Sequence, residues 1–319
     1  MRPRLAPTST VEWMDRRMLS VLAFLPNAGL GNKLFVWARA QTFASLNGLK
    51  CYSYGWTQPR IGPLLRGERR DIRYGAGLKW DIYGQLAGLL SQVSSRRWDY
   101  DPQIREIDIT SSERCSFIFK RVPHWSDYFI DIRDRRDDLM RLLSCALKSS
   151  VVEKVDAATA PIVAVHLRKG DFRDLRPGED FARVGLVRTP EDYFIELIDN
   201  VRSCAGTKLP VTIFSDGSDE ECRFLTRIEG IHRAPKLSDL ADMIIMSKAR
   251  VIIPSAGSTF GLWSSFLSSA AVIVHPDHYH APIRPPAINS TKFEGPAVGH
   301  WKDWDGLLIG NIKAVAKVA

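Results

Sequence analysis

Residues 161–172 read PIVAVHLRKGDF, a short apolar run that leads directly into a cluster of charge. The run over residues 162–165 is typical of a buried strand. Buried charge is costly unless it is paired, and open α/β sheets bind ligands where their strands end. Arg168 offers a planar fork of donors that suits phosphate, and Lys169 adds a point charge. The stretch therefore predicts a strand that ends in an anion site, with a solvated turn as the alternative.

The rest of the second half alternates strand and helix patterns. Strands are expected at residues 162–167, 211–215, 231–233, 251–254 and 271–275. Helices are expected at residues 189–203, 219–227, 238–247 and 260–267, with a short one at 306–318 in the tail. Thr189 is expected to cap the first of them, with Pro190 at its first position. This order predicts a Rossmann-like domain, a parallel sheet with helices on both faces.

The first half begins with a strand, a glycine-rich turn and a helix. The expected ranges are a strand at 18–25, the turn NAGLGN at 27–32, a helix at 33–46 and a strand at 49–54. Gly29, Gly31 and Asn32 lie in the turn, where a helix N-terminus can receive a phosphate. The alternative is that both glycines only tighten the turn. A strand near 116–120 and a long helix over 127–147 follow, and residues 149–160 are expected to separate two domains.

Two nucleotide-binding fingerprints are absent from the sequence. Leu34 occupies the position where the dinucleotide fingerprint needs its third glycine. The next strand is followed by residues 55–58, which contain no acid to hold a ribose. No P-loop motif occurs either. These absences disfavour an NAD-dependent oxidoreductase.

Length, composition and net charge limit the number of domains and the kinds of binding partner that are expected. The 319 residues favour about two domains, and 45% hydrophobic with 25% charged residues is ordinary for a globular protein. The formal net charge of +8 suits anionic partners. The basic clusters are interleaved with acids, so nucleic-acid binding is not expected. Oligomeric state is left open.

The cysteines and the apolar runs indicate the compartment. The five cysteines are scattered without metal-ligand spacing, which favours a reducing cytoplasm over a disulfide framework or a zinc site. His278 and His280 form an H-x-H pair without further ligands, so they are interpreted as loop residues. No signal peptide or membrane anchor is expected. The basic charge is compatible with peripheral association at the inner face of the membrane.

Three expected strand ends carry polar residues. His166, Arg168 and Lys169 follow the first, and Asp216 follows the second, where its carboxylate suits a ribose or a guanine edge. Ser258 and Thr259 follow the third, at a helix N-terminus whose free N–H groups bind anions. Alone, the acid is typical of a turn or helix cap, and the hydroxyls are typical of N-caps. Together they predict a nucleotide-diphosphate site in a cleft between two α/β domains.

Five segments resemble motifs of the bacterial α-1,2-fucosyltransferases, glycosyltransferase family 11. Residues 27–35 resemble G-G-L-G-N-Q-L-F, residues 123–129 resemble G-Y-W-Q-S-x-x-Y-F, residues 166–172 resemble H-x-R-R-G-D-[YF], residues 214–216 match F-S-D, and residues 242–247 with 258–263 resemble D-x-x-x-M-S followed by S-T-F-S-W-W. The departures are Lys33 for Gln, Lys169 for the second Arg, Gly217 for a second Asp, an enlarged turn at Ala256 and Gly257, and Gly261 with Leu262 for Ser-Trp.

The resemblance implies a GT-B-type enzyme, two Rossmann-like domains facing a cleft, that inverts and uses GDP-L-fucose without a metal or other cofactor. It places Arg168 at the β-phosphate, and His166 and Asp216 at the nucleoside. It adds to the donor site Gly29, Gly31, Asn32, Lys169, Ser258, Thr259 and Phe260. Asp171 is the catalytic candidate in the motif, either as general base or as a brace for Arg168; the other base candidates are Asp174, Glu179 and Asp180.

The expected domains are an arm at 1–17, an N-terminal acceptor-side domain at 18–155, a nucleotide-sugar domain at 156–285 and a tail at 286–319. The expected acceptor is an oligosaccharide or lipid-linked glycan, joined through an α-1,2 linkage. The alternatives are a transferase for another GDP-sugar such as GDP-mannose and a catalytically silent GDP-sugar-binding protein.

Overall fold

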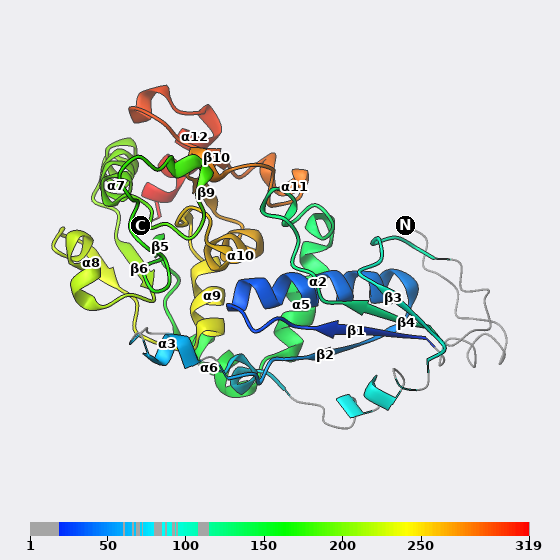
Figure 1. Cartoon of the computed structure of the whole chain (residues 1–319). Helices are drawn as coiled ribbons and strands as arrows, with labels where there is room; N and C mark the ends of the chain where they lie inside the picture. The colour runs from blue at the N-terminus through cyan, green and yellow to red at the C-terminus, as the bar shows by residue number, and fades with distance from the viewer. Residues whose placement is uncertain are drawn as a thin grey trace. The chain divides into compact units, whose positions relative to one another are not determined.

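The computed structural model describes residues 19–318, apart from positions 60, 66, 68–70, 72, 80–84, 87, 91, 92, 94 and 108–114. The arm expected at residues 1–17 lies outside the described residues. The chain divides into two compact units (Figure 1). The first comprises Met1–Gln58 with Lys79–Pro123, and the second comprises Pro59–Leu78 with His124–Ala319. Each unit is built around its own parallel sheet.

The first unit holds a four-stranded sheet in the order β2-β1-β4-β3. Its strands are β1 (Ser20–Phe24), β2 (Lys50–Tyr54), β3 (Arg97–Tyr100) and β4 (Cys115–Phe119). Helix α2 (Leu30–Asn47) covers it, and the ring of Phe43 lies 4.9 Å from that of Phe117 of β4, centroid to centroid, in a tilted contact. The strand, turn and helix predicted at the start of the chain are therefore present.

Helix α2 begins three residues earlier than the sequence suggested, at Leu30 instead of residue 33. Leu30 is buried, and this apolar anchor starts the helix directly after Gly29. Gly31 and Asn32 consequently lie in the first helical turn and not in a loop. The helix ends as predicted: Gly48 adopts the left-handed conformation, φ 65°, that glycine tolerates at a C-cap.

The second unit holds a six-stranded parallel sheet in the order β10-β9-β8-β5-β6-β7. Its strands are β5 (Val163–Leu167), β6 (Val211–Ser215), β7 (Ile231–Arg233), β8 (Val251–Ile253), β9 (Ala271–Val274) and β10 (Glu294–Pro296). Its helices are α3 (Ile61–Leu65), α5 (Arg136–Ala146), α6 (Ser149–Ala157), α7 (Glu191–Ala205), α8 (Asp219–Thr226), α9 (Asp239–Ser247), α10 (Thr259–Leu267), α11 (Pro286–Asn289) and α12 (Gly306–Ala316). The predicted fold class, α/β with parallel sheets flanked by helices, is confirmed.

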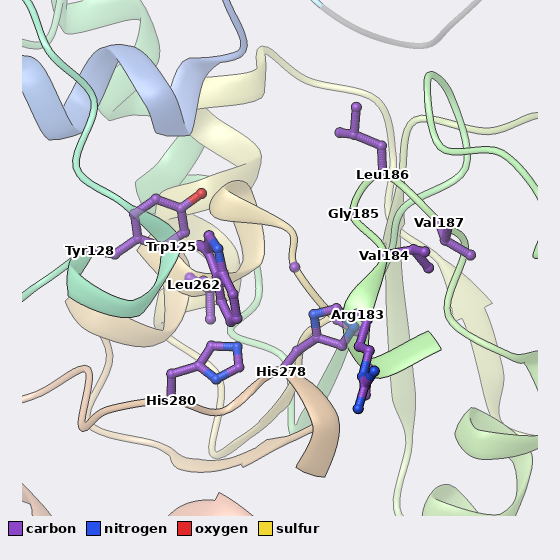
Figure 2. Close-up of a pocket in the computed structure, with 13 residues that line it drawn as sticks. Trp125, Tyr128, Arg183, Val184, Gly185, Leu186, Val187, Leu262, His278 and His280 are labelled. Atoms are coloured by element: carbon purple, nitrogen blue, oxygen red, sulfur yellow. The ribbon is translucent and has the colours of Figure 1, made fainter. Parts of the chain in front are cut away.

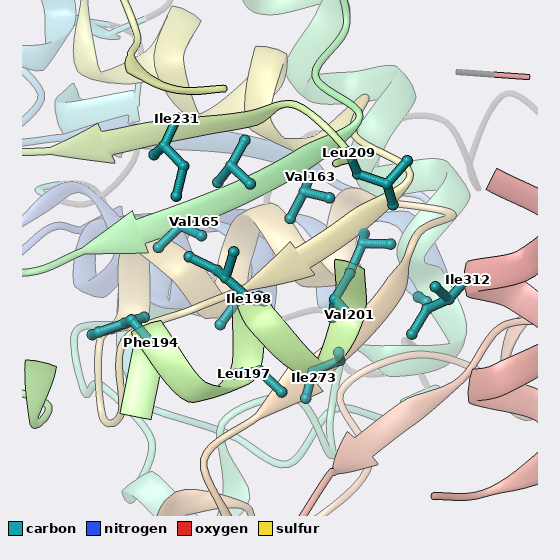
Figure 3. Packing of buried hydrophobic residues seen from close by; sticks show 14 of the residues in the cluster. Val163, Val165, Phe194, Leu197, Ile198, Val201, Leu209, Ile231, Ile273 and Ile312 are labelled. Atoms are coloured by element: carbon teal, nitrogen blue, oxygen red, sulfur yellow. The ribbon is translucent and has the colours of Figure 1, made fainter. Parts of the chain in front are cut away.

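Strand β5 is buried on both faces, as its uninterrupted apolar run predicts. Val163 and Val165 belong to the apolar cluster that packs against α7 and α12 (Figure 3). The ring of His166, on the alternate face, stacks against Phe260 of α10 with centroids 5.1 Å apart. One face of the strand therefore carries the His166 ring, and the other packs into the apolar core through Val163 and Val165.

The long helix expected over residues 127–147 is wrong in its first half. Short 3-10 turns occur at Trp125–Asp127 and Arg133–Arg135, and only α5 is an α-helix. Phe129 is buried, with its ring 4.9 Å from that of Phe266 in α10. The backbone of Ile132, also buried, leaves helical values at φ −124° and ψ −7°. Packing against α10 therefore overrides the local helical pattern.

The second unit takes residues 59–78 and then all residues from 124 onward, whereas the sequence suggested a single boundary at 155–156. Arg136 of α5 donates to the carbonyls of Phe266 and Leu267 at the end of α10. The expected linker over 149–160 contains α6, and Lys248 bonds the carbonyl of Val155 at 3.0 Å. These bonds hold α5 and α6 to the second unit.

The tail beyond residue 285 also belongs to the second unit, because β10 extends its sheet beside β9. The sequence did not predict β10, which contains Pro296. Proline is tolerated in an edge strand, where one N–H needs no partner, and β10 lies at the sheet edge. Helix α12, which was predicted, lies over α7, and its Leu308 joins the core.

Candidate functional site

Arg168 follows β5 and is held between two carboxylates. Its guanidinium donates to Asp216, which follows β6, and to Asp171 in the turn after β5. Arg168 and Asp216 are buried, while Asp171 is partly exposed. A guanidinium has five N–H groups, so two carboxylates orient it without using all its donors. The strand ends therefore produce a rigid, preoriented cation.

Lys169 is also buried, and its Nζ donates to Glu191 at 2.7 Å. Its backbone N–H donates to Asp216 at 2.9 Å. Gly217 allows this approach, because a Cβ there would lie 2.9 Å from Cβ of Lys169. The two departures from the family motif, Lys169 and Gly217, thus lie in contact with each other.

The turn from β8 to α10 is cross-linked to its neighbours. Ser255 donates from Oγ to the carbonyl of His166 and accepts the N–H of Arg168, both at 2.8 Å. Thr189, predicted to cap α7, instead accepts the N–H of Ala256 at 2.9 Å, and Pro190 takes the N-cap position. Gly257 has φ 65°, a conformation that side chains disfavour. The turn is therefore fixed in place next to Arg168.

Ser258 and Thr259 begin α10 at the same sheet edge. Ser258 is the N-cap residue, and its side chain makes no capping hydrogen bond. The first N–H groups of a helix lack partners within the helix, so they and the positive end of its dipole favour an anion. These two residues, Arg168 and Lys169 are thus gathered at the ends of neighbouring strands, as predicted.

His166 lies against α10 through a close packing contact. A Cβ on Gly261 would lie 2.8 Å from Cβ of Pro254 and 3.1 Å from Nδ1 of His166. Gly261, which replaces the serine of the family motif, thus leaves room for the imidazole. His166 and Phe260 both line a cavity in the second unit.

That cavity is also lined by Arg168, Asp216 and three residues that sequence reasoning did not assign to the site: Lys236, Asp239 and Asp242. Lys236 donates to Asp239 at 2.9 Å, and Asp239 exchanges backbone-to-carboxylate bonds with Asp71. Burial raises the pKa of Asp242 to about 7, with the nearby Asp239 and Asp71 adding to the rise. Asp242 opens the D-x-x-x-M-S segment, and this was the signal that could have assigned it.

The four carboxylates considered as general bases all face cations. Asp171 bonds Arg168, and Glu179 bonds Arg173 through both oxygens at 2.6 and 2.8 Å. Asp180 lies 3.2 Å from Arg183, and Asp174 lies 3.5 Å from Arg188. The pKa of Glu179 is lowered, mainly by its hydrogen bond with Arg173. The contact of Asp171 with Arg168 is the bracing arrangement that the sequence left open.

The remaining predicted residues, Gly29, Gly31 and Asn32, belong to the first unit. Gly29 is the N-cap of α2, and no side chain caps that helix start. Oδ1 of Asn32 is buried and makes no hydrogen bond with the described residues. Lys33, the next residue, turns inward and donates to the carbonyl of Gly55 at 2.6 Å.

Two features are absent from the part of the chain that the structure describes. There, no group of three or more His, Cys, Asp or Glu side chains is arranged as metal ligands would be. In that same part, no helix is both long enough and apolar enough to span a bilayer.

The class of protein is an α/β fold that gathers buried cations at the strand ends of its second sheet, and comparison with known families identifies the family. The model of glycosyl transferase family 11 matches residues 115–283. The match covers half of the chain and includes β5, β6 and the β8–α10 turn, so this protein belongs to glycosyl transferase family 11.

Solved structures with similarity to the chain are fucosyltransferases. NodZ from Bradyrhizobium, an α-1,6-fucosyltransferase soaked with GDP-fucose, is 14% identical over 78% of this chain and 92% of its own, with a TM-score of 0.46. POFUT1 in complex with GDP-fucose is 15% identical over 79% and 94%, with a TM-score of 0.42. A mutant of FUT1 from Arabidopsis thaliana with GDP is 13% identical over 84% and 74%, with a TM-score of 0.41. No curated protein matches the sequence.

Proposed function

We propose that this protein transfers L-fucose from GDP-fucose to a hydroxyl of a glycan, with inversion at the anomeric carbon and an α-1,2 linkage. The observation that supports it most is the gathering of Arg168, Lys169 and the uncapped start of α10 at one sheet edge. Membership of glycosyl transferase family 11 agrees with that reading. The activity class is that of a galactoside 2-α-L-fucosyltransferase.

Arg168 stabilises the leaving group in this proposal. Breaking the bond between fucose and the β-phosphate leaves additional negative charge on GDP. Donors that are already oriented toward this charge lower the barrier, because they need no reorganisation during the reaction. Asp171 and Asp216 provide that orientation through their bonds to the guanidinium. Asp171 therefore contributes to catalysis by positioning Arg168.

The nucleoside occupies the cavity lined by His166, Phe260 and Asp216 in this proposal. The stacked pair of His166 and Phe260 offers a flat surface, and the acidic side chains offer acceptors for ribose or base N–H and O–H groups. The diphosphate then lies between this cavity and the N–H groups at Ser258 and Thr259. Gly29, Gly31 and Asn32 are also proposed as donor-binding residues, on the resemblance of residues 27–35 to the family motif.

No metal or other cofactor takes part in the proposed reaction. Arg168 and Lys169 supply the positive charge that a divalent ion supplies elsewhere. The protein acts in the cytoplasm, with peripheral association at the inner face of the membrane when the acceptor is lipid-linked. The net charge of +8 favours such an anionic surface.

A donor panel tests the proposal. GDP release is measured with GDP-fucose and GDP-mannose, with glycan acceptors and with water alone. Faster release from GDP-fucose, with a fucosylated product, is expected. Preference for GDP-mannose contradicts the fucose assignment, and tight GDP-fucose binding with no release under any condition indicates a binding protein instead.

A further inference from the structure

A second cavity lies in the second unit, on the other side of the β8–α10 turn. Its volume is about 300 Å³, and it is lined by Ala256 and Gly257 of that turn (Figure 2). Phe260, three residues further along, lines the cavity that contains Arg168 and Asp216. The turn and the start of α10 thus contribute to the lining of both cavities, so a diphosphate bound at the turn is adjacent to both.

One wall of this cavity is aromatic. Trp125, Tyr128 and Leu262 lie on one side in Figure 2, with His280 beneath the indole. The indole of Trp125 is half exposed, and its centroid lies 3.9 Å from that of His280 in an edge contact. A large, partly exposed ring with a polar neighbour suits a ligand that has both an apolar face and hydroxyls.

The opposite wall is a strained but firmly held loop. Leu186 lines it with φ 58°, a backbone conformation uncommon outside glycine, and its side chain is 64% exposed. The N–H of Arg173 donates to the carbonyl of Leu186 at 3.0 Å, and the N–H of Arg188 donates to the carbonyl of Arg173 at 2.8 Å. Strain that neighbouring bonds maintain is concentrated at ligand sites.

His278 stands between the two walls with a defined tautomer. Its Nε2 lies 3.1 Å from the carbonyl oxygen of Phe181. A carbonyl only accepts, so Nε2 carries the proton, and in the neutral imidazole Nδ1 then keeps its lone pair. Nδ1 lies 3.6 Å from the position that a Cβ on Gly257 would occupy. The imidazole therefore presents an acceptor to the turn where the donor diphosphate is assigned.

We infer that this cavity is the acceptor subsite, which holds a neutral pyranose against Trp125 and places its reacting hydroxyl at Nδ1 of His278. The inference rests on the proposed transferase function. Among the residues that line the cavity, Arg183 is the one with a permanent charge, which fits a neutral sugar. The sequence had placed the acceptor side in the N-terminal domain together with Trp125, and the structure assigns Trp125 to the second unit.

His278 then accepts the proton in the transfer step, whereas each of the four candidate carboxylates contacts an arginine. The hydroxyl oxygen bonds to C1 of fucose while the bond from C1 to the β-phosphate oxygen breaks, and its electron pair leaves on GDP. The hydroxyl proton moves to Nδ1 of His278, and the imidazolium later releases it to water. The bond from Nε2 to Phe181 fixes the ring during the step.

Two pairs of variants test this assignment. Trp125→Ala is compared with Trp98→Ala, an indole of similar exposure (50% and 46%) on β3. His278→Gln keeps a donor for the carbonyl of Phe181 and removes the Nδ1 acceptor, and His232→Gln on β7 is its control. The acceptors are methyl glycosides of galactose, glucose, N-acetylglucosamine, mannose and rhamnose, supplied with GDP-fucose.

We expect the wild-type protein to fucosylate at least one glycoside. Trp125→Ala should then raise the KM for it about tenfold, the loss of one stacking contact. His278→Gln should lower kcat about 10²- to 10⁴-fold, the usual value of a general base, with unchanged KM and unchanged GDP-fucose affinity. Both control variants should behave like the wild type.

Donor binding without any glycoside separates the two proposals. If the wild-type protein does not bind GDP-fucose, the proposed function fails. If it binds GDP-fucose but uses no glycoside, or if Trp125→Ala and His278→Gln transfer like the wild type, the acceptor subsite is overturned alone. A loss of GDP-fucose affinity in His278→Gln as large as its loss of kcat also overturns it, because the cavity then belongs to the donor.

Discussion

Both units lead a strand into a helix through a glycine-containing turn, β1 into α2 in the first unit and β8 into α10 in the second, and each has a buried cation next to that turn. The two cations have different partners. In the first unit, Lys33 of α2 turns inward and bonds the neutral oxygens of Gly55 and Gln58, at 2.6 and 3.0 Å. In the second unit, Arg168 is held by two carboxylates at the strand ends. Lys33 thus links a loop to its helix, whereas Arg168 is oriented by carboxylates that use only some of its N–H donors. A buried cation beside such a turn is therefore a candidate ligand group where carboxylates orient it and leave some of its donors unused.

The largest expected effect is at Arg168. Arg168→Ala should reduce fucose transfer about 10²- to 10³-fold, because one preoriented donor to the leaving group is lost. It should also cost roughly 3–5 kcal/mol of unfolding free energy, because Asp216 is left buried without its cation. Steady-state kinetics and urea unfolding measure the two effects.

A double variant separates the effect of Arg168 on transfer from its effect on stability. Arg168→Ala with Asp216→Asn removes the uncompensated charge, so stability should recover while transfer stays low. If transfer recovers together with stability, the Arg168 guanidinium has only a structural role, and Arg168 and Lys33 do not differ in function.

Lys33 should affect stability and not donor binding. Lys33→Met leaves two partly buried acceptors without this donor, which costs roughly 1–3 kcal/mol. Lys33→Gln keeps an N–H donor and should lose less. Urea unfolding and GDP titration check this expectation. A loss of GDP affinity in either folded variant would show that the first turn also uses its cation on the ligand.

Gly261 tests the packing of His166. Gly261→Ala places a Cβ against Pro254 and His166, and such overpacking costs roughly 1–3 kcal/mol. It should also weaken GDP binding, because the imidazole must move. Gly310→Ala on α12, where the added Cβ meets nothing within 4 Å, is the matched control and should be neutral or stabilising by up to about 1 kcal/mol. Unchanged GDP affinity in a folded Gly261→Ala protein would remove His166 from the site.

The last prediction concerns the pH dependence of stability at Asp242. Its pKa is raised from 3.8 to about 7, so the folded state holds a proton that the unfolded state has lost between these values. Stability should therefore fall as pH rises from about 4 to about 7, by at most about 1.4 kcal/mol per pH unit for one proton. Asp242→Asn should flatten that slope in thermal unfolding. An identical slope in the variant would assign it to Asp71 or another group.

The sequence predicted the second sheet well because its strands are continuous apolar runs with clear turns between them. β6 and β7 were predicted with their observed ends, and β5, β8 and β9 to within one residue at each end. Residues 127–135 were harder, because Phe129 and Ile132 are buried against other elements and no local pattern encodes that contact. β10 was missed for another reason: it is a short edge strand that contains a proline.

The sequence predicted which residues form the candidate site better than it predicted the contacts between them. His166, Arg168 and Asp216 could be placed at strand ends from sequence, since parallel strands end at one edge. The hydrogen bonds between these residues could not be predicted, because the sequence does not show that the Asp216 carboxylate accepts from Arg168 when no ligand is bound. Ser255 and Thr189 were missed as positioning residues, since each bonds a residue more than sixty positions away.

Calorimetric titration of GDP, GDP-fucose and NAD into the wild-type protein, with and without chelator, tests the central claim most directly. The account predicts that GDP and GDP-fucose bind equally well in chelator, and that NAD does not bind. NAD binding in the absence of GDP binding would contradict the assignment of Arg168 and the β8–α10 turn to a GDP-sugar.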